Sequence, residues 1–294
     1  MIIDTFPFNK DFNALEIRFE ELRGVVDLFV ASESSYTHSG LPKPLHLSNA
    51  KQIQKEMGSQ LKIITSTKNR FTNNSRIREM LQRQELTKFL KSLNLSTSDL
   101  IMHSDCDEIP RSSIIRELAK SKDSIDVILE LTNYANYLNA YVGVWSRGRV
   151  QSFSKFKSIQ HMRADLFIQT AYSQRRHNLP FLRLTDYWTT RRYPFYLLPV
   201  YIRKPELQTI ANAGWHFNNL VNVNDIIYKI ESSSHAEWNT EEVRLKALKN
   251  YKSASDIYTG ELHQIVEIDE SYPRAITEKL EKWNMFIYNL DSRF

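Results

Sequence analysis

Three carboxylates follow an apolar run in the middle of this sequence. Residues 99–103 are predicted to form a short buried strand, and Asp105, Asp107 and Glu108 come directly after it, before Pro110 stops the backbone. In open α/β sheets, ligands bind at the carboxyl ends of the strands. Two aspartates one residue apart can turn toward the same hard cation, which commonly also carries a substrate phosphate. The motif therefore predicts a metal-dependent enzyme that acts on a phosphorylated or nucleotide-linked substrate.

The same segment has a second interpretation, in which the acids only cap a helix. Pro110 and Ser112 or Ser113 can begin a helix over residues 114–118. The carboxylates would then lie near the positive end of that helix. The local residues leave both interpretations open.

Composition limits the class of protein. With 294 residues, 41% of them hydrophobic, the chain can bury a full core. No segment approaches the roughly 20 apolar residues of a membrane span, and the opening residues predict a core strand and not a signal peptide. The single cysteine, Cys106, excludes an internal disulfide and suits a reducing compartment. We therefore expect a cytoplasmic protein without a transmembrane segment.

The charge pattern argues against nucleic acid as a partner. The net charge of +5 is mild, and the basic residues are scattered among acidic ones, unlike the clustered patches of nucleic-acid-binding proteins. The seven glycines form neither a dinucleotide fingerprint nor a P-loop. Any nucleotide must therefore be held without a glycine-rich loop.

Strand and helix patterns alternate over the first 123 residues. Strands are predicted at 2–6, 25–31, 61–64 and 99–103, and helices at 14–22, 48–57 and 74–93. This alternation favours an α/β fold with a parallel sheet and right-handed crossovers. Beyond residue 124 the pattern loosens into a strand at 127–131, aromatic-rich segments at 134–145 and 187–201, a strand-to-turn segment at 212–217, and helices starting at 226, 240 and 275.

One face of the helix predicted at 74–93 changes character along its length. Its first half carries Glu79, Gln82 and Arg83, and its second half carries leucines at 86, 90 and 93. Because helical spacing places these residues on one side, packing of the leucines turns the polar residues toward the protein. Arg83 would then pair with Glu108 or with a phosphate; alternatively, the polar end extends past the core into solvent.

Several segments, in this order, resemble glycosyltransferase family 17, and the resemblance covers most of the chain. They are Asp4-Thr5-Phe6-Pro7-Phe8-Asn9, Leu15-Glu16-Ile17-Arg18-Phe19, residues 33–44, Glu79-x-x-Gln82-Arg83, Asp105-Cys106-Asp107-Glu108-Ile109-Pro110, Gly214-Trp215-His216-Phe217, and Lys229 followed by His235-x-Glu237.

The resemblance implies a GT-A-like fold, with a Rossmann-type, mostly parallel central sheet flanked by helices and an irregular C-terminal acceptor half. It also implies a UDP-sugar donor (UDP-GlcNAc in the characterised enzyme), a glycan acceptor, a divalent metal and inversion at the anomeric carbon. We expect one domain over 1–294, with 1–123 binding the nucleotide-sugar and 124–294 the acceptor. Cys106 replaces the family's small residue between the aspartates. The missing anchor and stem favour a bacterial or viral-host cytosol over the Golgi lumen.

The resemblance assigns the metal to the acidic motif. Asp105 and Asp107 would position Mg²⁺ or Mn²⁺, the hard cations that oxygen ligands select. A third ligand would come from His235 or His216 in the C-terminal half.

The donor would lie where the first two strands end. Phe8, Asn9 and Glu33 are expected around the uracil and ribose, and Lys43 and Arg83 at the diphosphate, together with Asp105 through the metal. All of these follow predicted strands or face them.

Inversion requires a carboxylate that deprotonates the acceptor hydroxyl. Glu237 and Glu108 are the leading candidates and Asp186 is a third. Trp215 and His216 are expected to contact the acceptor or the GlcNAc ring, although Trp215 is also a candidate core residue.

Two other functions fit parts of the sequence. A metal-dependent phosphohydrolase with an aspartyl nucleophile also places Asp-x-Asp after a strand, but such motifs lie near the N-terminus and carry a small residue where this chain has Ile109. A sugar- or nucleotide-binding module that has lost catalysis would retain the same motif. Release of phosphate from generic phosphoesters would indicate the first, and UDP-sugar binding without turnover the second.

Overall fold

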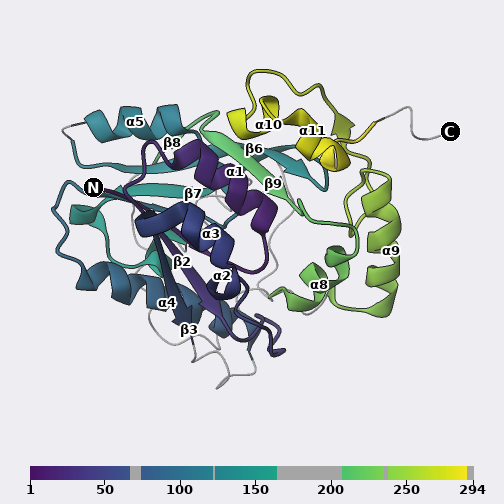
Figure 1. Cartoon of the computed structure of the whole chain (residues 1–294), viewed down its shortest axis with the longest axis horizontal. Helices are drawn as coiled ribbons and strands as arrows, with labels where there is room; N and C mark the ends of the chain where they lie inside the picture. The colour runs from purple at the N-terminus through teal and green to yellow at the C-terminus, as the bar shows by residue number, and fades with distance from the viewer. Residues whose placement is uncertain (67–73, 122, 164–206, 235–237, 290–294) are drawn as a thin grey trace, which may run out of the picture.

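The first four strands form a parallel sheet. β1 (Ile2–Pro7), β2 (Leu28–Ser34), β3 (Leu61–Ser66) and β4 (Leu100–His103) lie in the order β3-β2-β1-β4. The computed structural model describes residues 1–66, 74–121, 123–163, 207–234 and 238–289 (Figure 1). Because the chain builds outward from β1 to β3 and then returns to the other side of β1, the strand order reverses between β1 and β4. Such a reversal opens a crevice at the carboxyl ends of the two strands.

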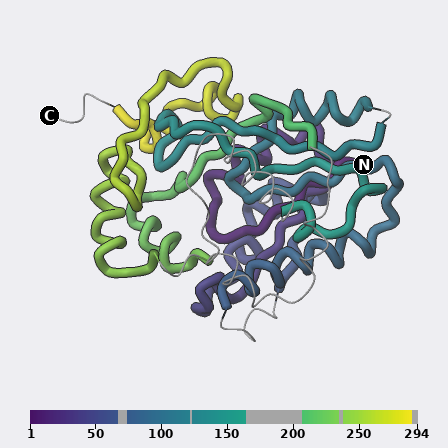
Figure 2. Tube along the Cα trace, turned by 180° about the vertical axis from the view of Figure 1, so that it is seen from behind, coloured from purple at the N-terminus to yellow at the C-terminus, as the bar shows by residue number. Residues whose placement is uncertain are grey.

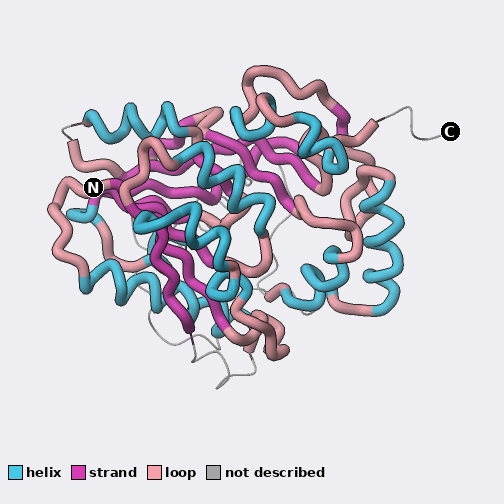
Figure 3. Tube along the Cα trace, in the orientation of Figure 1, coloured by secondary structure: helices cyan, strands magenta, loops and turns pink. Residues whose placement is uncertain are grey.

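Helices cover both faces of these strands (Figures 1 and 3). On one face lie α1 (Phe12–Leu22), α2 (His46–Asn49), α3 (Lys51–Met57) and α5 (Ser112–Lys120), and on the other lies α4 (Ser75–Ser92). Leu15 and Phe19 of α1 share a core with Met102, whereas Leu86 and Leu90 of α4 pack in a separate one. The alternation predicted for residues 1–123 is therefore confirmed.

The second half of the sheet contains antiparallel pairings that the sequence pattern did not predict, although β6 includes the strand predicted at 127–131 and β9 overlaps the strand-to-turn segment at 212–217. β6 (Asp126–Ala135) and β7 (Ala140–Ser152) form a hairpin, and β7 pairs antiparallel with β4. Beyond β6 come β9 (Gly214–Asn218), parallel to it, and β5 (Glu108–Pro110), antiparallel to β9. Figure 2 shows the teal tube of this hairpin beside the purple first strands. The sheet is thus mixed, although its N-terminal part is wholly parallel.

Short elements complete the described structure. β8 (Gln208–Ile210) pairs with β6 and β10 (Gln264–Ile265) with β7, and the 3₁₀ helices are η1 (Gly58–Gln60), η3 (Phe153–Lys155) and η7 (Asn284–Phe286). In the described part of the chain, every helix is too short or too polar to cross a bilayer.

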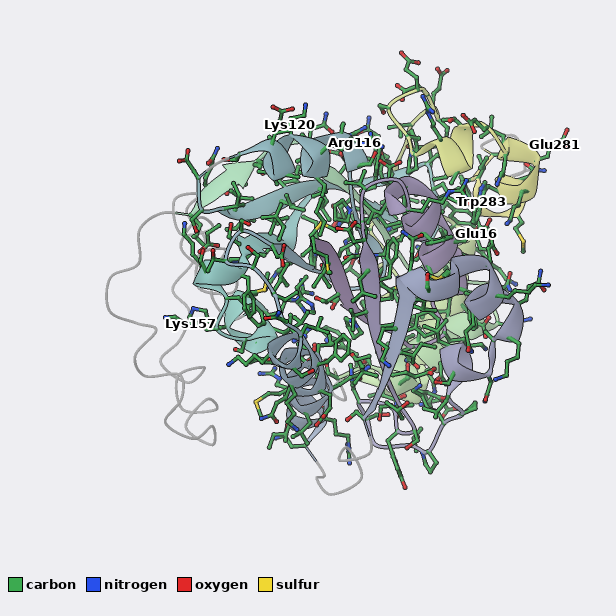
Figure 4. All side chains as sticks on the ribbon, turned by 60° about the vertical axis from the view of Figure 1, so that its left-hand side comes forward. Glu16, Arg116, Lys120, Lys157, Glu281 and Trp283 are labelled. Atoms are coloured by element: carbon green, nitrogen blue, oxygen red, sulfur yellow. The ribbon has the colours of Figure 1, made fainter. Side chains whose placement is uncertain are left out.

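Four C-terminal helices pack beside the sheet. α8 (Asp225–Ser232) and α9 (Glu241–Lys252) share a small core of their own, and Thr240 caps α9 through its hydroxyl. α10 (Arg274–Thr277) and α11 (Leu280–Trp283) pack on α1, where Trp283 joins the core around Ile17. Figure 4 labels Glu16 of α1 and Trp283 at this contact. The single helix predicted for 275–283 is therefore two short ones.

Candidate active site

A buried arginine fixes the backbone of the acidic loop, which we define as residues 105–108. Arg18 of α1 is completely buried, and its Nε and Nη2 donate to the carboxylate of Asp4 at 2.7 and 2.6 Å. Its Nη1 donates to the carbonyl oxygens of Asp105 at 3.0 Å and Glu108 at 2.7 Å, and Nη2 also reaches the Ser104 hydroxyl. Because these carbonyls turn inward to Arg18, the loop backbone is anchored beneath the acidic side chains.

Glu108 is saturated with hydrogen bonds. It is 1% exposed, and one carboxylate oxygen accepts from Trp145 Nε1 at 2.7 Å while the other accepts from the Asp105 backbone N–H at 2.8 Å. Both oxygens also accept from Arg163, at 2.9 and 3.1 Å. With its lone pairs committed, this carboxylate is a poor proton acceptor, and it instead holds Asp105 and Arg163 in place.

Asp105 lies between two guanidinium groups. Its carboxylate accepts from Arg163, and Arg83 lies 3.5 Å away while also pairing with Glu79 at 2.7 Å. Burial alone would raise the pKa of Asp105, but the two arginines hold that pKa well below its ordinary value. At 37% exposure, its side chain is the most open of the acidic loop's ion-paired carboxylates. The expected pairing of Arg83 with Glu108 is wrong, because Arg163 occupies that carboxylate.

Asp107 points to a different set of partners. Lys229 of α8 lies 3.3 Å from both Asp107 and Asp11, and His216 Nε2 lies 3.7 Å from the other oxygen of Asp107. Burial would lower the pKa of Lys229, but the two carboxylates raise it above its usual value, so the ammonium remains charged. Burial and the neighbouring Asp107 raise the pKa of Asp11, against the opposing effect of Lys229.

Two histidines border this cluster with unsatisfied nitrogens. His216 stacks on Trp145 with ring centroids 4.8 Å apart, and its Nδ1 is buried without a hydrogen-bond partner among the described residues. His103, at the end of β4, contacts Thr5 through Nδ1. Burial and the positive charges of Arg83 and Arg163 hold the pKa of His103 well below its ordinary value, so this ring is neutral.

The donor set fits a cation that shares its ligands with a substrate. Asp105 and Asp107 supply the hard oxygens that Mg²⁺ or Mn²⁺ prefers. Over the described ranges, however, no three His, Cys, Asp or Glu side chains stand close enough to hold an ion by themselves. Mg²⁺ typically binds through one or two carboxylates and completes its shell with phosphates and water. The described residues match that open arrangement and do not form a closed cage around an ion.

Comparison with known proteins identifies the family to which this site belongs. The family model of glycosyltransferase family 17 matches residues 1–175, which include the first four strands and the whole acidic loop. The chain belongs to glycosyltransferase family 17.

Two curated relatives match a shorter segment. Over 44 residues the chain is 46% identical to the β-1,4-mannosyl-glycoprotein 4-β-N-acetylglucosaminyltransferases of Rattus norvegicus and Homo sapiens. The matched segment covers 15% of this chain and 8% of each relative. The comparisons therefore show membership of family 17, while the reaction of this chain and the sugars that it uses need separate support.

The other residues expected at the donor have structural partners in this family 17 chain. Phe8 is completely buried and packs on Phe12. The side chain of Asn9 is bonded to Ser232 and Tyr228. These two positions lie at the predicted edge, but their side chains are engaged by α1 and α8.

Glu33 and Lys43 differ in how far other parts of the protein already engage their side chains. The buried carboxylate of Glu33 accepts from the backbone N–H groups of Leu47 and Ser48 at 2.8 and 3.0 Å, and so caps α2. A uridine contact would have to displace these bonds. Lys43 is partly exposed, and burial lowers the pKa of its ammonium group. Contact of either residue with the donor remains a prediction.

The expected acceptor residues divide between the two faces of β9. His216 faces Asp107, as described above, whereas Trp215 is 2% exposed, with the Arg111 guanidinium 4.1 Å from its ring centroid. The tryptophan therefore packs as core, which was the alternative to the expected contact with the acceptor or the GlcNAc ring. His235, Glu237, Asp186 and the aromatic segment 187–201 lie outside the described residues.

Sequence reasoning missed four charged residues of the site, namely Arg18, Asp11, Arg163 and Lys229. Two of them stood in segments quoted for the family resemblance, but a lone basic residue in an amphipathic helix carries no local sign of a buried partner. Cys106, between the two aspartates, turns its side chain into the core and is 3% exposed.

Proposed function

We propose that this family 17 glycosyltransferase is an inverting, metal-dependent enzyme that transfers a sugar from a UDP-sugar to a glycan hydroxyl. The observation that carries the proposal is the position of the acidic loop. It leaves β4 beside the carboxyl end of β1, where the strand order reverses. Ligands of open α/β sheets bind at such a reversal, and carboxylates together with fixed cations suit a metal-bound diphosphate.

Asp105 and Asp107 are proposed to hold Mg²⁺ or Mn²⁺. When bound, the cation supplies Lewis-acid stabilisation of the charge that develops on the leaving diphosphate. The aspartates reach the site from an anchored loop, because Arg18 holds the backbone carbonyls on either side of them. His216 and His235 remain candidates for a further ligand.

Three cations next to the acidic loop are proposed to face the diphosphate. Arg83, Arg163 and Lys229 each contact one of the two aspartates. Guanidinium groups bind phosphate in a bidentate fashion, and lysine binds it as a point charge. Their fixed positions would favour binding of an anionic donor even before the metal ion binds.

The catalytic base is proposed to be a carboxylate other than Glu108. Single displacement needs a proton acceptor within hydrogen-bond reach of the acceptor hydroxyl. Because Glu108 already receives four hydrogen bonds, Glu237 is the stronger of the two leading candidates, and Asp186 stays the third.

The identity of the sugar rests on the relatives. The activity in their names, N-acetylglucosaminyl transfer to a mannosyl-glycoprotein, supports UDP-GlcNAc as the donor and a glycan or glycoconjugate as the acceptor. The single buried cysteine supports a cytoplasmic site of action.

The test is a panel of nucleotide-sugars with purified protein and Mn²⁺, in which slow release of UDP is measured with and without chelator. Chelator-sensitive release from one UDP-sugar, lost in Asp107→Asn, would support the proposal and name the donor. Absence of both release and thermal stabilisation by UDP with Mn²⁺ would refute the donor site. Stabilisation without release would mean that turnover requires the acceptor, which a second panel of glycans then supplies.

A further inference from the structure

A groove lined by tyrosines and polar side chains lies between β6, β7 and residues 264–272, which lead from β10 toward α10. Its volume is about 270 Å³. The residues that matter for its chemistry are Tyr134, Tyr141, Tyr272, Gln264, Glu267 and Asp269. None of them belongs to the acidic loop or to its charged partners.

The groove opens on the opposite face of the sheet from the acidic loop. Asn133 of β6 pairs with His216 of β9, and His216 faces Asp107. Successive residues of a strand point to opposite faces, so the neighbouring Tyr134, which stacks on Phe217, faces away from the loop. A molecule in the groove therefore cannot be the group that reacts at Asp105 and Asp107.

The charge of the groove excludes phosphorylated ligands. Glu267 and Asp269 are exposed at its rim, and among the described residues none that lines it is lysine or arginine. The nearby Arg111 is already engaged, because it donates to the Ser271 carbonyl at 3.2 Å and covers the ring of Trp215. Nucleotides and phosphates would meet carboxylates without a compensating cation.

Tyr141 offers ring surface to the groove, and the buried Tyr134 and Tyr272 pack behind it. Tyr134 contacts Tyr141 and Tyr272 with ring centroids 6.2 and 5.2 Å apart, and Tyr141 is the partly exposed member. The buried Tyr272 hydroxyl has no hydrogen-bond partner within the described structure. Burial raises the pKa of both Tyr134 and Tyr272, so their hydroxyls remain neutral.

This combination matches the surface of a sugar. A pyranose ring presents C–H groups that pack on an aromatic ring, and hydroxyls that donate to carboxylates and amide oxygens. The volume falls just below the range of about 300–1,000 Å³ typical of drug-sized ligands, which corresponds to one or two rings. We propose that this groove binds a neutral mono- or disaccharide unit, apart from the transfer site.

The proposal does not depend on the transfer reaction, so its test uses the whole chain in chelator and without donor. Saturation-transfer NMR and calorimetry would measure binding of maltose, cellobiose, N,N′-diacetylchitobiose and α-mannobiose, with UDP as the anionic probe. Tyr141→Ala removes the partly exposed ring, and Glu267→Gln removes one rim charge without altering shape. The matched control is Trp238→Ala, which removes an aromatic side chain 44% exposed elsewhere on the surface.

We expect at least one neutral disaccharide to bind with a dissociation constant of roughly millimolar size. Tyr141→Ala should weaken that binding about tenfold and Glu267→Gln about threefold, whereas Trp238→Ala leaves it unchanged and UDP does not compete. Absence of binding by all four sugars at about 10 mM, equal loss in the Trp238 control, or competition by UDP would each overturn the proposal. A failed transfer assay would leave all of these outcomes unaffected.

Discussion

Removal of the Arg18 guanidinium tests whether the acidic loop is held from beneath. Arg18→Met keeps most of the side-chain volume but leaves Asp4 charged, buried and unpaired, since both residues are completely buried. Breaking a buried ion pair from one side costs about 3–5 kcal/mol. With a whole-domain stability of about 5–15 kcal/mol, the variant should lose about a fifth or more of its free energy of unfolding in urea.

The double variant Asp4→Asn/Arg18→Met separates the fold from the loop. Removing the orphaned charge should restore about 2–3 kcal/mol relative to the sum of the two single variants. The loop carbonyls of Asp105 and Glu108 still lack the guanidinium Nη1, and keep only the Glu108 backbone N–H and the Ser104 hydroxyl as donors. We therefore expect the double variant to fold. It should, however, need at least about tenfold more UDP with Mn²⁺ than the unmodified protein to reach the same thermal stabilisation.

Asn139→Ala is the matched control for this experiment. Asn139 is a buried polar residue whose amide holds the backbone of Tyr288, far from the acidic loop. It should lower stability without changing the ligand response. A free energy of unfolding for Arg18→Met within about 1 kcal/mol of that of the unmodified protein would refute the role of Arg18. So would an equal response to ligand in the double variant and the control.

Other perturbations probe the site and the fold separately. Asp107→Asn should lower metal-dependent UDP release by about a hundredfold or more, and a retained rate would remove this residue from the site. Glu108→Gln places an amide among four donors and should cost about 1–3 kcal/mol in urea unfolding; loss of activity at unchanged stability would instead make Glu108 the base. Gly214→Ala brings a Cβ within 2.1 Å of the Ile109 carbonyl at φ +152°, so its thermal unfolding should shift down by the equivalent of about 3 kcal/mol or more, and an unshifted melt would contradict the β5–β9 register. Burial raises the pKa of Tyr228 from 10.0 to about 12, so its contribution to stability is complete below pH 10 and is lost as pH rises toward 12; Tyr228→Phe should flatten urea stability over that window, and an unchanged slope would contradict the assignment.

The N-terminal fold was predictable because its signals are local. Each parallel strand is a short apolar run, and each helix carries its own amphipathic pattern, so β1 to β4 and α1 to α4 fall within a few residues of the predicted ranges. β7 was missed because Gly143 and Gly148 interrupt it and its aromatic residues suggest a loop. Its pairing with β4 is a long-range contact that no local pattern encodes.

The candidate site was predictable only in part, for a related reason. The acidic loop and the inward face of Arg83 follow from strand and helix periodicity. Arg18, Arg163 and Lys229 become site residues through contacts with a loop that is distant in sequence. A buried charge needs a partner, but the sequence does not say which of 39 lysines and arginines supplies it.

The bridge that Lys229 makes from Asp11 to Asp107 has a consequence for the order in which parts of the protein fold. These charges are far apart along the chain, and β5, which directly follows the acidic loop, takes β9 as its described partner. Contacts of such long range form late, because loop closure must precede them. As the chain emerges from the ribosome, the aspartates are made first and their ammonium counter-charge arrives more than a hundred residues later. The acidic loop and Lys229 therefore come together only once α8 docks, after the second half of the chain is in place.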